Sequence, residues 1–211
     1  MEPIGVPLPT LRRLPLYLRL LEKKEIAGDA WLSSEAMARE LGFGAIQVRK
    51  DLSAVGALGI PKRGFPVEET SRLLGKFLGA DDCSETFLVG TGSLARAILS
   101  DEGIGRRGFK IVAVFEPDPK AEHPDDRHYQ PLERLPELAA RMGTRLAILA
   151  PEPRWAEEAV AAIAGSKIDG VLDLTGTALS FPARISVVRE SFSAGLSALA
   201  GAVRSKRGPE D

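Results

Sequence analysis

The sequence predicts an α/β protein in which a small helical domain precedes a parallel sheet and its helices. Three observations favour this fold class. Residues 10–78 carry apolar side chains at three- and four-residue steps, as amphipathic helices do. From residue 86 onwards, apolar runs alternate with helical patterns, and the first run ends in a Gly-Thr-Gly turn. At 211 residues the chain is long enough for two domains.

Three helices are predicted in the first part of the chain, and Pro15 lies near the start of the first one. They are expected at residues 10–24, 33–41 and 45–55. Ser33 or Ser34 begins the second helix, because a serine hydroxyl can accept hydrogen bonds from the free amides at a helix start. The turn Gly42-Phe43-Gly44 then leads into the third helix, which is typical of a helix-turn-helix unit.

A short excursion rich in glycine follows the third helix and carries the basic pair Lys62-Arg63, so we interpret it as a wing. A fourth helix is predicted over residues 67–78. The polar side of the third helix is suited to the major groove, where Gln pairs with adenine, Arg pairs with guanine and Lys reaches phosphates. The candidate DNA-binding residues are Gln47, Arg49, Lys50, Ser53, Lys62 and Arg63. The alternative interpretation is an ordinary solvated helix face.

The second part of the chain predicts a Rossmann-like domain, because buried apolar strands separated by helices form a parallel sheet covered on both faces. Strands are expected at residues 86–89, 110–115, 145–150, 169–174 and 184–188, with helices at 94–99 and 156–164. A last helix at 193–203 places Leu196, Leu199, Ala200 and Val203 on one side, with Phe192 just before it. This apolar side needs a surface to pack on.

The pattern Gly90-x-Gly92-x-x-Ala95 follows a predicted strand and opens a helix, which is the context of a dinucleotide-binding turn. Gly90 permits a sharp turn, Gly92 lets the backbone approach a pyrophosphate, and Ala95 lets the helix pack closely on the sheet. Backbone amides at the helix start would face the anion. The candidate residues of the turn are Gly90, Thr91, Gly92, Ser93 and Leu94. The alternative is that the glycines serve turn geometry alone.

Glu116 stands at the end of the next predicted strand, 24 residues after Gly92. An acid about 20 residues after the turn accepts hydrogen bonds from the ribose of a dinucleotide. A carboxylate there would repel a 2'-phosphate, and the following residues offer no basic group before Lys120. The sequence therefore favours NAD(H) over NADP(H).

Several functions are disfavoured. A dehydrogenase needs a substrate site and a proton donor beside the cofactor, and the residues after Asp81 are nearly all used by the sheet and its helices. We therefore expect no enzyme. His123 and His128 lie in a loop without other metal-ligand residues, so we expect no metal site. With a single cysteine, Cys83, and no stretch long enough to span a membrane, we expect a cytoplasmic protein without a membrane partner.

Six segments, together with the glycine turn, resemble a known family along nearly the whole chain. They are YLRLLE at 17–22, QVRKDLS at 47–53, KRG at 62–64, RGFKIVAVFEPDP at 107–119, AILAPEP at 147–153 and IDGVLDL at 168–174. QVRKDLS is the most specific of them. Taken together, the sequence resembles the Rex family of bacterial redox-sensing transcriptional repressors.

The resemblance implies a homodimer that binds double-stranded operator DNA and releases it when NADH binds, so that the protein reports the NADH/NAD+ ratio. It implies a winged-helix domain at 1–80, a Rossmann NAD(H)-binding domain at 81–190 and a swapped dimerisation helix with a tail at 191–211. It also implies cofactor contacts from Ala150 and Pro151, entry of Phe192 into the partner's nicotinamide pocket, and a coupling role for Arg19.

The sequence departs from the family pattern at several positions. Ser191 stands where the family has Asp, and Asp101 or Glu102 where it has Tyr; these two family residues help lock the reduced-cofactor state. Asp173-Leu174-Thr175-Gly176 replaces NFAP, and Ala54-Val55 replaces an aromatic pair. Such departures are typical of a divergent paralogue with altered cofactor preference or DNA site. The alternative function is an NAD- or CoA-binding protein without redox-gated DNA binding.

Overall fold

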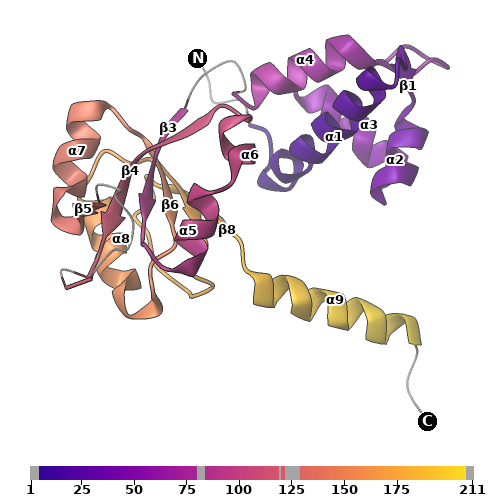
Figure 1. Cartoon of the computed structure of the whole chain (residues 1–211). Helices are drawn as coiled ribbons and strands as arrows, with labels where there is room; N and C mark the ends of the chain where they lie inside the picture. The colour runs from indigo at the N-terminus through magenta and orange to yellow at the C-terminus, as the bar shows by residue number, and fades with distance from the viewer. Residues whose placement is uncertain (1–4, 80–83, 119, 122–128, 208–211) are drawn as a thin grey trace. The chain divides into compact units, whose positions relative to one another are not determined.

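The fold is described from a computed structural model that covers residues 5–79, 84–118, 120–121 and 129–207 (Figure 1). The chain divides into two compact units, Met1–Asp82 and Cys83–Asp211. Cys83, His123 and His128 lie outside the described residues. None of the helices in the described ranges combines the length and apolar content that a membrane crossing requires.

The first unit is helical, as predicted. Its helices are α1 (Leu8–Ile26), α2 (Ser34–Leu41), α3 (Ala45–Ala54) and α4 (Val67–Phe77). Apolar residues from all four helices form one core, in which Leu14, Leu21 and Leu52 are fully buried. Pro15 lies inside α1 and removes one backbone donor there. The buried leucine face continues on both sides of Pro15, and the helix persists through it.

The helix-turn-helix junction forms as the sequence predicted. The hydroxyl of Ser33 accepts a hydrogen bond from the amide of Ala36 at 3.1 Å and so caps α2. Gly42 ends α2 with a φ of 73°, a conformation that favours glycine. Residues 42–44 then lead directly into α3.

The wing is also present. Strands β1 (Trp31–Leu32) and β2 (Phe65–Pro66) pair antiparallel, and Ile60 bridges Gly64 at the base of a tight turn. Gly64 has a φ of 97°, and a Cβ there would lie 2.5 Å from the carbonyl oxygen of Leu32. Only glycine is accommodated at this crossing, which fixes the wing beside β1.

The second unit contains a six-stranded parallel sheet in the order β5-β4-β3-β6-β7-β8. The strands are β3 (Ser84–Val89), β4 (Phe109–Glu116), β5 (Tyr129–Pro131), β6 (Leu146–Leu149), β7 (Gly170–Asp173) and β8 (Ser186–Arg189). This is the strand order of a Rossmann fold. From β3 the chain adds strands toward one edge of the sheet (β4, β5), and from β6 it adds them toward the other edge, so the strand order reverses between β3 and β6. Ligands of such sheets bind outside the carboxyl ends of the strands at the reversal point.

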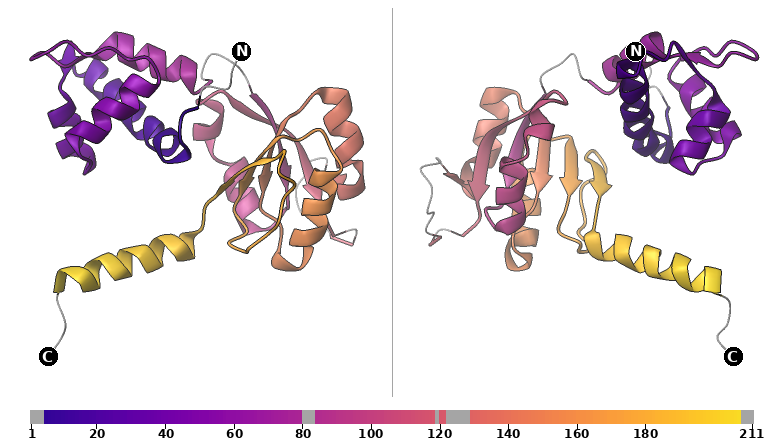
Figure 2. Two further views of the ribbon diagram at one scale, coloured as in Figure 1. Left: turned by 180° about the vertical axis from the view of Figure 1, so that it is seen from behind. Right: turned by 45° about the vertical axis from the view of Figure 1, so that its right-hand side comes forward.

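Helices cover the two faces of the sheet unequally (Figure 2). The helices of this unit are α5 (Ser93–Leu99), α6 (Glu102–Gly105), α7 (Leu135–Met142), α8 (Ala156–Ala164) and α9 (Phe192–Arg207), and α9 extends away from the sheet. Helices α7 and α8 pack in the larger apolar core of the sheet, and α5 packs in the smaller one on the other face. Residues 174–185, which connect β7 to β8, contain no helix.

Two parts of this unit go beyond the sequence prediction. Strand β5 and helix α7 lie in residues 129–142, where the sequence analysis expected no element. Two prolines interrupt the apolar pattern there, yet Leu135 and Leu138 are buried against the sheet. Helix α9 is longer than predicted, and its apolar stripe is exposed within the single chain.

Candidate cofactor site and nucleic-acid interface

The glycine turn lies where three strand ends meet. The amide of Gly90 donates to the carbonyl of Phe115 after β4 at 2.8 Å, and the amide of Ala150 after β6 donates to the carbonyl of Val89 at 2.9 Å. Gly90 has a φ of 115°, and a Cβ at this position would lie 2.3 Å from the carbonyl oxygen of Ala150. Gly90 is therefore required by close backbone approach as well as by conformation.

Gly92 has a different environment from Gly90. Its φ is −64°, and a Cβ added there would meet nothing within 4 Å. No internal contact requires glycine at this position, so the open space in front of it is available to a ligand. Ala95 is fully buried against the sheet, as the pattern predicted. Helix α5 has only seven residues, and the side chain of Leu94 packs into the core beneath it.

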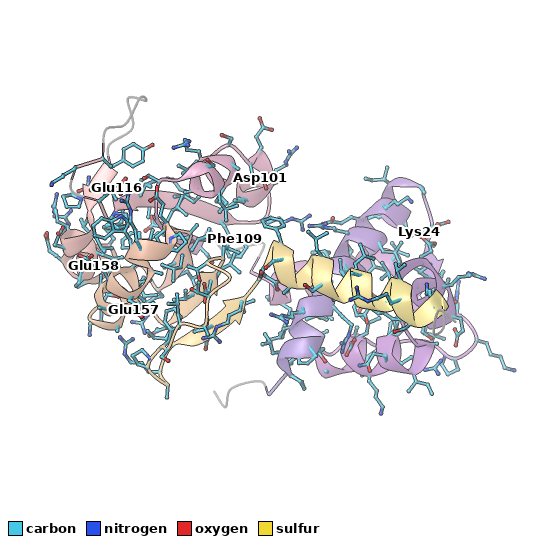
Figure 3. The ribbon with its side chains drawn as sticks, turned by 90° about the horizontal axis from the view of Figure 1, so that it is seen from below. Lys24, Asp101, Phe109, Glu116, Glu157 and Glu158 are labelled. Atoms are coloured by element: carbon cyan, nitrogen blue, oxygen red, sulfur yellow. The ribbon has the colours of Figure 1, made fainter. Side chains whose placement is uncertain are left out.

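Glu116 ends β4 beside the turn, at the opposite end of the strand from Phe109 (Figure 3). One carboxylate oxygen accepts a hydrogen bond from the hydroxyl of Thr91, and the other accepts one from the amide of Asp118 at 2.7 Å. These two bonds orient the carboxylate next to the glycine turn. The sequence placed Glu116 at this edge, and the structure brings it together with Gly90, Thr91, Gly92 and Ser93 around one cavity.

The cavity measures about 490 Å³, within the range of small-molecule sites. Its other lining residues are Arg96, Pro117, Asp118, Ala121, Glu152, Arg154 and Trp155. Arg96 donates to the carbonyl of Thr91 at 2.8 Å and so ties the turn to α5. Arg154 lies 3.4 Å from Asp118 and 3.0 Å from Glu152, so two carboxylates balance its charge. The indole nitrogen of Trp155 has no hydrogen-bond partner within the described ranges.

The remaining predicted cofactor residues are placed as follows. Ala150 and Pro151 are buried behind the turn, where the backbone of Gly90 crosses them. Phe192, at the start of α9, is 81% exposed.

Asp173, at the carboxyl end of β7, is buried and accepts hydrogen bonds from the amide and hydroxyl of Thr175. Asp101 caps α6 through the amide of Gly103, so this departure from the family pattern has a local structural role.

The outward face of α3 is defined by its buried residues. At about 100° per residue, Ile46, Lys50 and Ser53 fall in one narrow stripe opposite buried Val48 and Leu52. Ile46 is 64% exposed. The side chains of Lys50 and Ser53 make no hydrogen bond or ion pair within the part of the chain that the structure describes. The predicted readers Gln47 and Arg49 flank this stripe, and their side chains have partners.

A buried carboxylate anchors α3 to α1. Asp51 is 1% exposed and accepts hydrogen bonds from four residues. The donors are the Thr10 hydroxyl at 2.9 Å, Arg13 through Nε at 2.6 Å and Nη2 at 2.9 Å, the Tyr17 hydroxyl at 2.7 Å and Gln47 Nε2 at 2.9 Å. We call these five residues the Asp51 cluster. Sequence analysis missed it, because apolar periodicity does not register a buried polar residue.

The hydrogen bonds of the cluster determine the ionisation of Asp51. Burial raises the pKa of Asp51, but the hydrogen bonds from its four partners outweigh that effect and lower the pKa to about 2. Burial, together with the bond to the Asp51 carboxylate, raises the pKa of Tyr17 above its ordinary value. At neutral pH the cluster therefore pairs an ionised Asp51 carboxylate with the Arg13 guanidinium and keeps the Tyr17 hydroxyl as a donor.

Two further contacts position basic residues around the wing. Arg49 donates to a carboxylate oxygen of Glu35 at 2.8 Å and to the hydroxyl of Ser34 at 3.1 Å. The guanidinium of Arg63 lies 4.2 Å from the ring centroid of Trp31 on β1, and this contact holds the wing. A cavity of about 430 Å³ separates α3 from the wing, and Arg49, Ser53 and Lys62 line it.

The two units together define a class of protein: a winged helix-turn-helix unit joined to a Rossmann-type sheet with a dinucleotide-type turn. Residues 5–53 match the family described as "Putative DNA-binding protein N-terminus". The chain is 33% identical to the redox-sensing transcriptional repressor Rex of Treponema denticola, over 94% of this chain and 96% of that protein. It is 30% identical to the Rex repressor of Pelotomaculum thermopropionicum, over 94% of each chain.

Solved structures agree with the fold. The chain superposes with a TM-score of 0.84 on RSP in complex with β-NAD+ and operator DNA, at 24% identity, covering 96% of this chain and 94% of that one. RSP in complex with β-NADH superposes with a TM-score of 0.83 over 96% of both chains. The chain belongs to the Rex family of redox-sensing transcriptional repressors.

Proposed function

We propose that this protein is a DNA-binding transcriptional repressor that senses the NADH/NAD+ ratio, and that NADH binding releases operator DNA. The observation that carries the proposal is its 33% identity, along 94% of the chain, to a redox-sensing repressor. The two candidate sites support it independently, because each unit has a surface suited to one of the two ligands. In this proposal NAD(H) is a signal and the protein is not an enzyme.

The glycine turn is the proposed NAD(H) site. The space in front of Gly92 leaves room for a pyrophosphate beside the backbone amides of Thr91 to Leu94. Glu116 is held beside the turn by Thr91 and the Asp118 amide, in a position suited to a ribose hydroxyl. Arg154 is already paired with Asp118 and Glu152, which supports NAD(H) over a cofactor with an added 2'-phosphate.

The outward stripe of α3 and the wing form the proposed DNA interface. Lys50 and Lys62 are exposed and supply positive charge for phosphates. Ser53 lies beside them on the cavity between α3 and the wing. Gln47 and Arg49 lie at the flanks of the stripe and, with Arg63, complete the proposed contact set.

The exposed apolar stripe of α9 supports a homodimer. Phe192, Leu196 and Leu199 are between 61% and 81% exposed in the single chain. A second copy that exchanges α9 with the first would cover this stripe and bring Phe192 to the partner's cofactor site, which is the arrangement we propose for residues 191–211.

Coupling between the sites follows from linkage. If NADH stabilises a dimer in which the two α3 helices miss successive major grooves, about 34 Å apart, NADH weakens DNA binding. DNA must then weaken NADH binding by the same factor by which NADH weakens DNA binding. Arg19 is exposed on α1, and we keep it as a candidate for transmitting this change.

Fluorescence anisotropy of a labelled operator duplex tests the proposal. NADH should release the duplex, while NAD+ should not. Glu116→Ala should weaken NADH binding roughly tenfold or more and remove the response, because a charged acceptor is lost. Glu158→Ala, which removes an exposed carboxylate from α8, is the matched control (Figure 3). Quenching of Trp155 at the cavity reports NADH binding directly.

The DNA contacts have their own test. Lys50→Ala should weaken duplex binding and reduce its dependence on salt by about one ion per subunit of the dimer, with NADH affinity unchanged. If NADH and NAD+ acted equally on the duplex, the sensor role would be refuted. Cofactor binding without any duplex binding would support the alternative, an NAD- or CoA-binding protein without gated DNA binding.

A further inference from the structure

Ile46 lies at the centre of the surface that the proposed function assigns to DNA. It is the second residue of α3 and is 64% exposed. On the helix it lies between Lys50 and Ser53, opposite the side that packs on α1. The polar residues of this face therefore surround an aliphatic side chain.

No internal role accounts for this isoleucine. Its side chain lies outside the apolar core of the unit. A β-branched residue adds nothing to helix propensity on a surface and provides no cap. Single exposed aliphatic residues are common on proteins and need no explanation by themselves. The position of Ile46 is what distinguishes it, because side chains near the start of a recognition helix contact base edges.

The chemistry of the major groove restricts what Ile46 can contact. Three of the bases present mainly hydrogen-bonding groups there, whereas thymine also presents its C5-methyl group. An aliphatic side chain has no donor or acceptor, so it would leave a polar base edge without a partner. Lys50, beside Ile46 on the helix, supplies a charge that suits a DNA phosphate. Gln47, in contrast, is held at the flank of α3 by its bond to Asp51.

We propose that Ile46 is a specificity-determining residue that contacts the methyl group of one thymine in each operator half-site. This inference rests on the proposed DNA-binding function and deepens it by naming a base and the group that is read. The remaining α3 contacts supply charge and hydrogen bonds, while Ile46 supplies discrimination at one base pair.

The test removes only the methyl group. Duplexes that bind the full-length protein are selected from a random pool, and each thymine of the selected site is then replaced by deoxyuridine. At one thymine per half-site, binding should weaken roughly fourfold, as expected for one buried methyl group. Two symmetric replacements should weaken it by more than tenfold. The Ile46→Ala variant should bind the thymine and deoxyuridine duplexes equally.

Two control variants separate the outcomes. Ile46→Val keeps a branched aliphatic side chain and should retain the preference for thymine. Leu58→Ala removes another exposed aliphatic residue of this unit, 82% exposed, and should also retain it. Unchanged binding of every deoxyuridine duplex, or an undiminished preference in Ile46→Ala, would overturn the inference while leaving DNA binding intact. Failure to select any duplex would refute the proposed function itself.

Discussion

The two units position their candidate sites by different means. In the first unit, α3 is anchored through side chains, since Asp51 joins it to Thr10, Arg13 and Tyr17 of α1 by hydrogen bonds. In the second unit, the glycine turn is positioned through the backbone, and its tightest constraint is the approach of Gly90 to the carbonyl of Ala150. The stability of the first unit should therefore depend on charge and pH, whereas the stability of the second should depend on added side-chain volume at the turn.

The largest expected effect comes from adding one methyl group at Gly90. Gly90→Ala places a Cβ on the carbonyl of Ala150 at a φ of 115°, so the strand ends must separate. We expect a loss of about 3 kcal/mol in the free energy of unfolding of the sheet unit. Denaturant unfolding followed by Trp155 fluorescence, in a Trp31→Phe background, measures it.

Gly92→Ala is the matched control for that substitution. Its Cβ meets nothing within 4 Å, so the unfolding free energy should change by less than about 0.5 kcal/mol. The same variant should weaken NAD(H) binding if a pyrophosphate occupies the space in front of it. Equal losses of stability at Gly90 and Gly92 would contradict the distinction between a steric and a ligand-facing glycine.

The next effect is the pH dependence of the first unit. The pKa of Asp51 is about 2 in the folded protein, below its unfolded value of about 3.9. Its stabilisation is therefore complete above about pH 4 and is lost as the pH falls toward 2. We expect a loss of about 2 kcal/mol over this range, measured by Trp31 fluorescence in a Trp155→Phe background.

Asp51→Asn isolates that effect. The amide cannot ionise, so the variant should be less stable at neutral pH and should lack the acid-dependent loss that Asp51 contributes. The sheet unit, followed by Trp155 in the complementary background, serves as the internal control. An identical acid profile in wild type and Asp51→Asn would show that other carboxylates control acid unfolding.

The difference between the units also explains what the sequence predicted well. Helix stripes, the Ser33 cap and the Gly90 turn depend on neighbouring residues, so local patterns identified them. In the Asp51 cluster, Asp51 joins residues of α1 that lie 34 to 41 positions away, and no local pattern marks such a pairing. Arg154 likewise reaches the cavity from the loop after β6 only once the sheet is assembled. Ile46 shares the predicted outer face of the third helix, but an exposed aliphatic residue carries no hydrogen-bonding signal that marks a DNA contact in a sequence.

The smallest expected change in stability concerns the wing. It distinguishes a stabilising role of Arg63 from a DNA-binding role of Lys62. Arg63 lies over Trp31, so Arg63→Met should lower the unfolding free energy of the first unit by roughly 0.5–1 kcal/mol, measured by Trp31 fluorescence. Lys62→Met should leave stability unchanged and weaken DNA binding, because Lys62 has no partner within the described residues. Arg72→Met, an exposed cation on α4, is the control for loss of charge alone. If Arg63→Met matched that control in stability, the cation over the indole would not hold the wing, and Arg63 would join Lys62 as a phosphate contact only.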